Sequence, residues 1–194
     1  MAVAVLGLAG SPRCHGNTAI LLEQALAGAA AAGARVERVD LSRLCIAPCR
    51  ACDRCFEDGL CVVQDDYQRV LERLLAADAV ILASPIYFLG VTAWAKALID
   101  RCQCLWVRRT VLHQELPPTS DGRPRRGAFL STAGAANTSF AGAVATVKAW
   151  LSTLDAVYAG EVLRRNVDAA GAIRGDAEAL EQAFALGQLV AGAQ

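Results

Sequence analysis

The chain has 194 residues, 55% of them hydrophobic, and its 19 basic and 19 acidic side chains give a formal net charge of zero. This length and hydrophobic share favour a single domain over residues 1–194 with one buried core. Balanced charge argues against a nucleic acid or an anionic membrane surface as a partner, because both select for basic faces. No apolar run reaches the roughly 18 residues that a bilayer-spanning helix needs, so a membrane partner is not expected.

The eight cysteines of the chain come without a secretion signal. The first ten residues, MAVAVLGLAG, lack the basic segment that opens a signal peptide, and a buried strand explains them better. Cysteines of proteins that are not secreted stay reduced and serve metal binding or redox chemistry. We therefore expect a cytoplasmic protein that uses some of its cysteines chemically.

The first predicted strand, residues 2–9, is a short apolar run that ends at Gly10. Such a run is typical of a parallel strand buried on both faces. A helix is predicted at residues 17–32, which are rich in alanine and leucine and are followed by Gly33 as a C-terminal cap. The loop between them, GSPRCHGNT, lacks the Gly-Lys-Ser/Thr ending of a Walker A loop and the glycine pattern of a dinucleotide site.

This first loop has the residues of a phosphate site. Backbone N–H groups at the start of a helix attract anions, and the side chains of Ser11, Asn17 and Thr18 can add hydrogen bonds. Arg13 supplies positive charge. The alternative is an ordinary helix start, with Asn17 or Thr18 as the capping residue.

A cysteine-rich loop at residues 45–61 follows a strand predicted at residues 36–41. Its segment CRACDRCFEDGLC contains four closely spaced cysteines, which are Cys49, Cys52, Cys55 and Cys61. Thiolates packed this densely can converge on one soft metal centre, and overlapping Cys-x-x-Cys steps resemble the ferredoxin run that holds a 4Fe–4S cluster. Zinc, free or redox-active thiols, and a relic loop that binds nothing are the alternatives.

The remaining elements alternate between helix and strand. Helices are predicted at 67–77, 93–104, 139–154 and 176–190, strands at 79–83, 128–131 and 156–162, and a polar loop or lid at 106–126. Five strands alternating with helices indicate an α/β fold, a doubly wound parallel sheet with helices on both faces. Such sheets bind ligands at the carboxyl ends of their strands, so the loops there are the candidate sites.

Two more strand ends carry residues suited to a flat ligand. The loop SPIYFLG, residues 84–90, holds an aromatic pair between a proline and a glycine. This pattern predicts an exposed turn against which an aromatic ring can lie. The loop STAG, residues 131–134, follows the next strand, and its small residues let backbone amides approach a ring closely.

Together, the segments GSPRCHGNT, SPIYF, AKALIDR and CRACDRCFEDGLCVVQDD resemble the flavodoxin-fold NADPH-dependent FMN reductases, and more closely their iron–sulfur flavoprotein branch. The resemblance runs from residue 2 to about residue 134 and leaves the loop at 106–126 without a family motif. It implies a flavodoxin-like five-stranded sheet that binds FMN. The implied phosphate contacts are Ser11, Arg13, Asn17 and Thr18, the ring contacts are Pro85, Ile86, Tyr87, Phe88, Thr132 and Gly134, and the cluster ligands are Cys49, Cys52, Cys55 and Cys61.

The resemblance also implies a function. It is that of an FMN-dependent oxidoreductase or electron-transfer flavoprotein that couples FMN to a 4Fe–4S cluster, with NAD(P)H as candidate donor and a small molecule or a ferredoxin-like protein as partner. The alternatives are an NAD(P)H-dependent FMN or quinone reductase without a cluster, and a non-enzymatic redox or metal sensor. No Ser-His-Asp or paired-carboxylate arrangement stands out, so no side chain is expected to act as a hydrolytic acid or base.

A homodimer or homotetramer is expected, partly from the same resemblance. The physical reason is that a flavin held at loop tips needs shielding. The region of Tyr87, Phe88 and Trp94 supplies apolar surface that a second copy can cover.

The segment around residue 100 is interpreted without a chemical role. Lys96, Asp100 and Arg101 are expected on a solvated helix face. Cys102 and Cys104 lie two residues apart on the predicted helix, so we expect them to face apart and not to form a redox pair.

Overall fold

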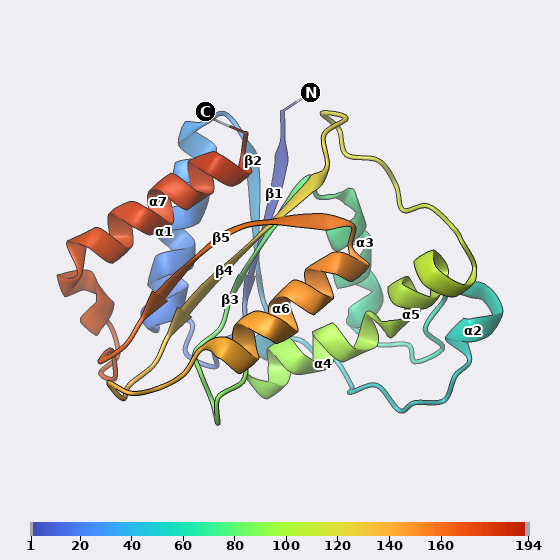
Figure 1. Cartoon of the computed structure of the whole chain (residues 1–194), viewed down its shortest axis with the longest axis horizontal. Coiled ribbons are helices and arrows are strands. Elements are labelled where there is room, and N and C mark those ends of the chain that lie inside the picture. Colours follow the sequence, from blue (N-terminus) through green and yellow to red (C-terminus); the bar gives the residue numbers. More distant parts are fainter. Residues whose placement is uncertain (1, 193–194) are drawn as a thin grey trace.

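The computed structural model describes residues 2–192 and contains a five-stranded parallel sheet (Figure 1). Its strands are β1 (Ala4–Ala9), β2 (Arg35–Asp40), β3 (Ala79–Ala83), β4 (Arg125–Thr132) and β5 (Ala156–Arg164). They lie in the order β2-β1-β3-β4-β5, and every neighbouring pair is parallel. In this flavodoxin-like order the winding direction reverses between β1 and β3. The predicted fold class is confirmed.

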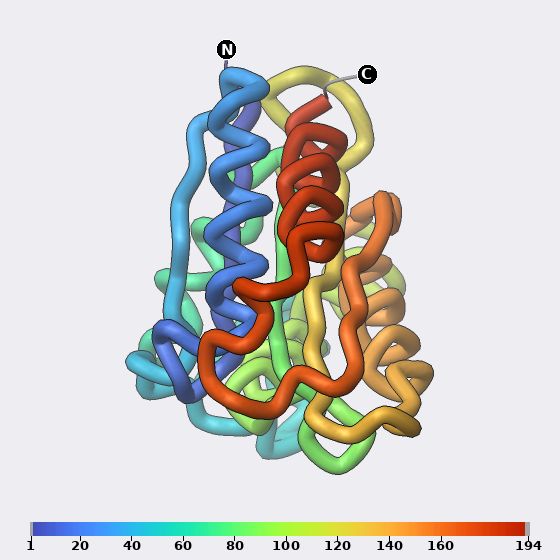
Figure 2. Tube along the Cα trace, turned by 90° about the vertical axis from the view of Figure 1, so that its left-hand side faces the viewer, coloured from blue at the N-terminus to red at the C-terminus, as the bar shows by residue number. Residues whose placement is uncertain are grey.

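Helices cover both faces of the sheet. On one face α1 (Asn17–Ala31) and α7 (Ala177–Val190) lie side by side (Figure 2). The other face carries α3 (Tyr67–Ala76), α4 (Ala93–Arg101), α5 (Gln103–Trp106) and α6 (Ala141–Thr153). Four short turns of helix complete the described residues: η1 (Leu41–Arg43), α2 (Cys55–Asp58), η2 (Val107–Val111) and η3 (Ala172–Gly175). Within residues 2–192, none of these helices is both long and apolar enough to cross a membrane.

Two hydrophobic cores lie on the two faces of the sheet, because successive strand residues point to opposite sides. In β1, Leu6 and Leu8 belong to the core under α3–α6, whereas Val5 and Ala9 belong to the core under α1 and α7. All five residues of β3 are buried. The central strands therefore carry apolar residues at nearly every position, as the apolar runs of the sequence predict.

β4 begins three residues before the strand predicted at 128–131. Its first residue, Arg125, is buried. The Arg125 guanidinium donates to the backbone carbonyls of Ala77 at 2.8 Å, Leu154 at 2.9 Å and Leu75 at 3.0 Å. Burial lowers the pKa of Arg125. These hydrogen bonds let a charged residue belong to the strand, although residue 125 lies in the segment predicted as a loop or lid.

The helix predicted at 93–104 divides at Cys102 into α4 and α5. The segment from Trp106, predicted as a loop or lid, instead starts within this helical region, and a π-helical turn spans Val107–Val111. Val107 is fully buried. Its packing explains why the segment stays helical despite the polar residues that follow it.

Candidate functional site

The loops after β1, β3 and β4 meet at one edge of the sheet and are joined by hydrogen bonds. The Gly10 N–H donates to the Ala83 carbonyl at 2.7 Å, and the Thr92 hydroxyl donates to the Gly10 carbonyl at 2.5 Å. The Ile86 N–H donates to the Thr132 carbonyl at 3.0 Å. This edge contains the switch point between β1 and β3, where sheets of this order bind their ligands.

The start of α1 presents backbone donors without a side-chain cap. Gly16 occupies the capping position, and within the described residues no side-chain hydrogen bond caps the helix. The Gly16 N–H closes a turn onto the Arg13 carbonyl at 2.9 Å, and Ser11 Oγ accepts from the Arg13 N–H at 3.1 Å. The cap is therefore neither Asn17 nor Thr18, and the N–H groups of the first turn point toward a place suited to an anion.

The Asn17 side chain is already engaged. Its amide nitrogen donates to the carbonyls of Ala169 at 2.9 Å and Val167 at 3.4 Å, and its oxygen accepts from the Ile173 N–H at 3.2 Å. These bonds fasten the segment after β5 to the start of α1. Asn17 can offer a phosphate its backbone N–H, but its amide group holds the protein together.

A cavity of about 150 Å³ lies between these loops, and we call it the rim cavity. Nine of the ten residues that the resemblance assigns to FMN line it: Ser11, Arg13, Asn17, Thr18, Pro85, Ile86, Tyr87, Thr132 and Gly134. Its wall is completed by Gly16, Val167 and Asp168. The fold therefore brings the ends of β1, β3, β4 and β5 around one hollow at the switch point.

Phe88 is the tenth residue, and it does not line the rim cavity. It lies at the tip of a turn in which Tyr87 and Gly90 exchange two backbone hydrogen bonds of 3.0 Å. Phe88 and Leu89 have φ angles of 48° and 63°, a left-handed conformation that costs non-glycine residues roughly 1–2 kcal/mol each. The turn leaves the Phe88 side chain fully exposed to solvent.

Two wall residues of the rim cavity were missed because no sequence motif marks them. Val167 and Asp168 lie between β5 and α7, beyond the motifs of the sequence analysis. The Val167 N–H donates to the Ala133 carbonyl at 3.0 Å. A Cβ on Gly134 would lie 3.0 Å from Asp168 Oδ1, so glycine permits this close approach. Only the three-dimensional arrangement reveals these contacts.

The cysteine-rich loop forms a second cavity of about 40 Å³, which we call the thiol cavity. Its wall includes all four predicted ligands and three residues from α4 and α5: Cys49, Cys52, Cys55, Cys61, Arg101, Gln103 and Cys104. Burial, followed by the nearby Cys104, raises the pKa of the Cys55 thiol. Among residues 2–192, no three Cys, His, Asp or Glu side chains are arranged to hold a single metal ion.

The backbone of the thiol cavity is strained on both sides of Cys52. Ala51 and Asp53 have φ angles of 49° and 56°, although neither is glycine. Such angles cost non-glycine residues roughly 1–2 kcal/mol each, so the loop is held in a strained conformation around Cys52. Gly59 also has positive φ, and a Cβ there would lie 2.1 Å from Arg108 Cγ.

Arg101 is not on a solvated helix face, so that prediction is wrong. Its side chain is 0% exposed, stacks 4.4 Å above the Tyr67 ring and pairs with Asp65 at 2.8 Å. Burial opposes the charge on Asp65, but hydrogen bonds from Arg101 and a backbone N–H outweigh burial and lower its pKa. Lys96 and Asp100 do form an exposed ion pair at 2.8 Å.

Cys102 and Cys104 are both buried. Trp150 Nε1 donates to Cys102 Sγ at 3.3 Å, and burial raises the pKa of Cys102 to about 12. The Tyr67 hydroxyl lies 3.2 Å from Cys104 Sγ. No sequence motif marks Cys104 as a wall residue of the thiol cavity, because its neighbours come from distant segments.

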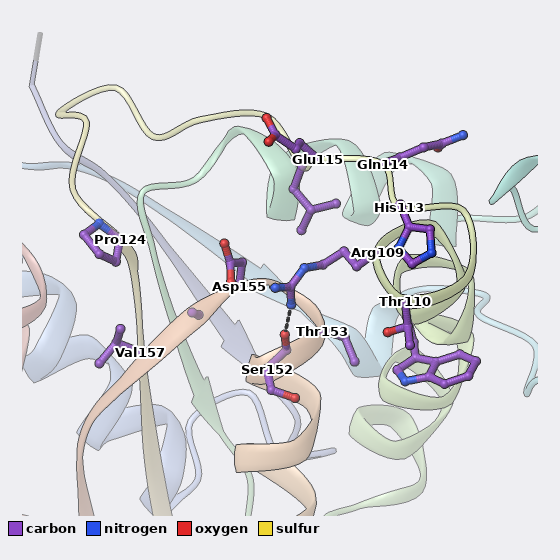
Figure 3. Close-up of a pocket in the computed structure, with 13 residues that line it drawn as sticks. Arg109, Thr110, His113, Gln114, Glu115, Pro124, Ser152, Thr153, Asp155 and Val157 are labelled. Carbon is purple, nitrogen blue, oxygen red and sulfur yellow. Dashed lines mark hydrogen bonds and ion pairs between the residues drawn. The ribbon is translucent and has the colours of Figure 1, made fainter.

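A larger cavity of about 950 Å³ lies between the segment after α5 and the start of β5 (Figure 3). Arg109 reaches across it, donates to the Ser152 carbonyl and pairs with Asp155 at 2.7 Å. This cavity lies at the amino end of β5, whereas the rim cavity lies at the carboxyl ends of the strands. None of the residues predicted to bind a cofactor lines this larger cavity, so we assign it no role.

Comparison with known proteins matches most of the chain to one family. The family model described as NADPH-dependent FMN reductase matches residues 3–185. An iron–sulfur flavoprotein of Methanocaldococcus jannaschii is 42% identical over 101 residues, which cover 52% of this chain and 52% of that protein. An iron–sulfur flavoprotein of Methanosarcina thermophila is 29% identical over 157 residues, covering 81% of this chain and 77% of that protein.

Solved structures agree on the fold. A flavone reductase superposes with a TM-score of 0.70 at 19% identity, covering 98% of this chain and 62% of that one. At this identity the likeness concerns the fold alone. The sequence matches reach about half the length of several relatives, including the protein of Methanocaldococcus jannaschii.

Proposed function

The chain belongs to the NADPH-dependent FMN reductase family, and from that membership we propose that it is a flavin-dependent oxidoreductase. FMN binds in the rim cavity, and a 4Fe–4S cluster binds the four cysteines of the thiol cavity. Relatives named iron–sulfur flavoprotein support the second part of the proposal.

The convergence of nine predicted residues on one cavity, beside an uncapped helix start, carries the FMN proposal. The first-turn N–H groups of α1 and the exposed Arg13 suit a phosphate. Tyr87 lies on one loop of the cavity, while Thr132 and Gly134 lie on another, which suits a flat ring between them. One phosphate loop without a second nucleotide-binding signature favours FMN over FAD.

The donor set of the thiol cavity supports the cluster. Four thiolates are soft ligands, and the four cysteines line a common cavity. A cubane binds each thiolate through a different iron atom, so it suits ligands spread around a cavity.

When bound, FMN exchanges electrons in pairs or singly and a 4Fe–4S cluster exchanges one at a time, so together they connect two-electron and one-electron partners. The chain itself binds and orients these groups. NAD(P)H is the proposed two-electron donor, and a small molecule or a ferredoxin-like protein is the proposed second partner. The proposed compartment is the cytoplasm.

Anaerobic mixing with NADPH tests the function. We expect the flavin absorbance to bleach, repeated turnover once an electron acceptor is added, and chromatography of the released flavin to give FMN. A non-enzymatic redox or metal sensor, in contrast, would show no turnover with nicotinamide or reduced-ferredoxin donors. Release of mostly FAD, or no flavin after reconstitution, would sink the FMN assignment.

We also propose a homodimer or homotetramer. The turn beside the rim cavity exposes large apolar side chains, with Phe88 106%, Leu89 57% and Tyr87 46% exposed, and Trp94 in the first turn of α4 is 39% exposed. Apolar surface gathered beside a cofactor site is suited to cover by a second copy. Light scattering at micromolar concentration should give at least a dimer, and a monomer would contradict the proposal.

A further inference from the structure

A single buried guanidinium closes the thiol cavity. Arg101 Nε donates to Cys61 Sγ at 3.1 Å. Its Nη1 donates to the Ala47 carbonyl at 3.0 Å and to Asp65 Oδ2 at 2.8 Å, and its Nη2 donates to the Val63 carbonyl at 2.7 Å. Every nitrogen of the fork therefore has a partner on or beside the cysteine-rich loop.

These contacts fix both ends of the segment that carries the four cysteines. Ala47 lies two residues before Cys49, and Val63 lies two residues after Cys61. The planar fork of arginine can hold two carbonyls, a carboxylate and a sulfur at once, whereas the three donors of a lysine ammonium radiate from one atom. The geometry of this site accordingly requires arginine and not merely a positive charge.

The charge on Arg101 is retained inside the protein. The guanidinium of arginine is not deprotonated in proteins, and here it pairs with Asp65 Oδ2 at 2.8 Å. The ring of Tyr67 stacks against the guanidinium at 4.4 Å, which adds a cation–π contact. A permanent cation therefore lies against one candidate ligand, away from bulk water.

The same helix connects Arg101 with the rim cavity. α4 begins after Thr92, whose hydroxyl accepts from the Ala95 N–H at 3.3 Å and donates to the Gly10 carbonyl at 2.5 Å. Arg101 is the last residue of α4. One rigid element thus runs from the loop proposed to hold FMN to the sulfur proposed to hold the cluster.

We propose that Arg101 is a positioning residue that sets the reduction potential of the iron–sulfur centre through its hydrogen bond to Cys61 Sγ and its buried positive charge. Adding an electron makes the centre more negative, and a cation and a sulfur-directed donor stabilise that form. Arg101 therefore makes the centre easier to reduce. This inference rests on the proposed cluster in the thiol cavity.

The test is a potentiometric titration of the reconstituted protein under anaerobic conditions, monitored by visible absorbance and electron paramagnetic resonance. The variants are Arg101→Gln and Arg101→Lys. Lys96→Gln is the matched control, because it removes one positive charge from the same helix at an exposed ion pair. Iron and sulfide are assayed in every sample before titration.

We expect Arg101→Gln to lower the equilibrium constant for one-electron reduction of the centre by at least tenfold, a midpoint shift of about 59 mV in the negative direction. Arg101→Lys retains the charge but loses the Nε donor, so it should shift less in the same direction. Lys96→Gln should leave the midpoint unchanged. A merely structural role would alter iron loading without moving the midpoint of the centres that do form.

Midpoints in both Arg101 variants equal to that of the parent would overturn the inference. If Arg101→Gln does not fold or load iron, an unchanged midpoint in Arg101→Lys overturns the role assigned to the hydrogen bond with Cys61. If neither variant loads iron while the parent does, Arg101 is a structural clamp and the inference fails. A parent protein without iron after reconstitution would instead contradict the proposed cluster itself, so the two failures are distinguishable.

Discussion

The rim cavity and the thiol cavity are built in different ways. The rim cavity gathers residues from the ends of four strands, and backbone hydrogen bonds between loops hold it together. The thiol cavity takes most of its wall from one loop and depends on side chains of α4 and α5 for its anchoring. A site made by sheet topology follows from strand positions, whereas a site made by one loop depends on the few side chains that fix the loop.

The largest expected effect is the loss of iron from the thiol cavity without loss of FMN from the rim cavity. Serine in place of any one of Cys49, Cys52, Cys55 or Cys61 should abolish stable loading of about four irons per chain while FMN stays bound, because each thiolate holds one iron of the cluster. The measurement is iron, sulfide and flavin content after anaerobic reconstitution. Cys45→Ser is the control, since Cys45 belongs to the same loop but does not line the thiol cavity. Full iron retention in one variant removes that cysteine from the ligand set.

Next, Asp65→Asn should weaken the anchoring of the thiol cavity and leave the rim cavity intact. Removing this carboxylate leaves the buried Arg101 without its charged partner, which costs roughly 3–5 kcal/mol at buried ion pairs. Denaturant unfolding should show the loss, and FMN affinity should be unchanged. Equal unfolding free energies of parent and variant would show that the ion pair does not anchor the loop.

The same substitution has a defined pH dependence. The folded-state pKa of Asp65 lies below its ordinary value, so its carboxylate contributes stability above the unfolded pKa of about 3.9. That contribution is lost as the pH falls through the lower folded pKa. The difference in unfolding free energy between parent and Asp65→Asn should be constant near neutral pH and shrink below about pH 4.

A substitution at the rim cavity should weaken FMN binding and leave the iron content unchanged. The double variant Ser11→Ala with Arg13→Gln should weaken FMN binding at least about 100-fold, because two lost hydrogen bonds to a charged group, at about 1.5–3 kcal/mol each, together cost about 3–6 kcal/mol. Iron content should stay at the level of the parent. Titration of apo-protein with FMN measures the effect, with His15→Gln as a control in the same loop that lies outside the cavity wall. Unchanged affinity would place the phosphate elsewhere.

The smallest expected effect on cofactors belongs to Phe88. Because this exposed side chain lies outside the rim cavity, Phe88→Ser should change FMN affinity less than twofold and leave iron content unchanged. If the turn packs against a second copy, light scattering should show a larger fraction of monomer. A large loss of FMN affinity in a variant that keeps its oligomeric state would show that Phe88 contacts the flavin directly.

The sheet was predictable because its buried strands are uninterrupted apolar runs. The prediction for β3 matches its observed bounds, Ala79–Ala83, and the polar loops after the strands lie at the predicted edge. The burial of charged residues was not predicted where their partners are distant in sequence. Arg125 continues β4 and Arg101 closes the thiol cavity because each is paired inside the fold. Asp168 lacked any local motif, since only folding brings it to Gly134.

The central claim is that one chain holds FMN and a 4Fe–4S cluster in separate cavities. A visible spectrum with flavin, iron, sulfide and zinc quantification on anaerobically purified and reconstituted protein tests it most directly. The account predicts about one FMN and about four irons with matching sulfide per chain, and the absorbance of both groups in one spectrum. Stoichiometric zinc in place of iron would contradict the account.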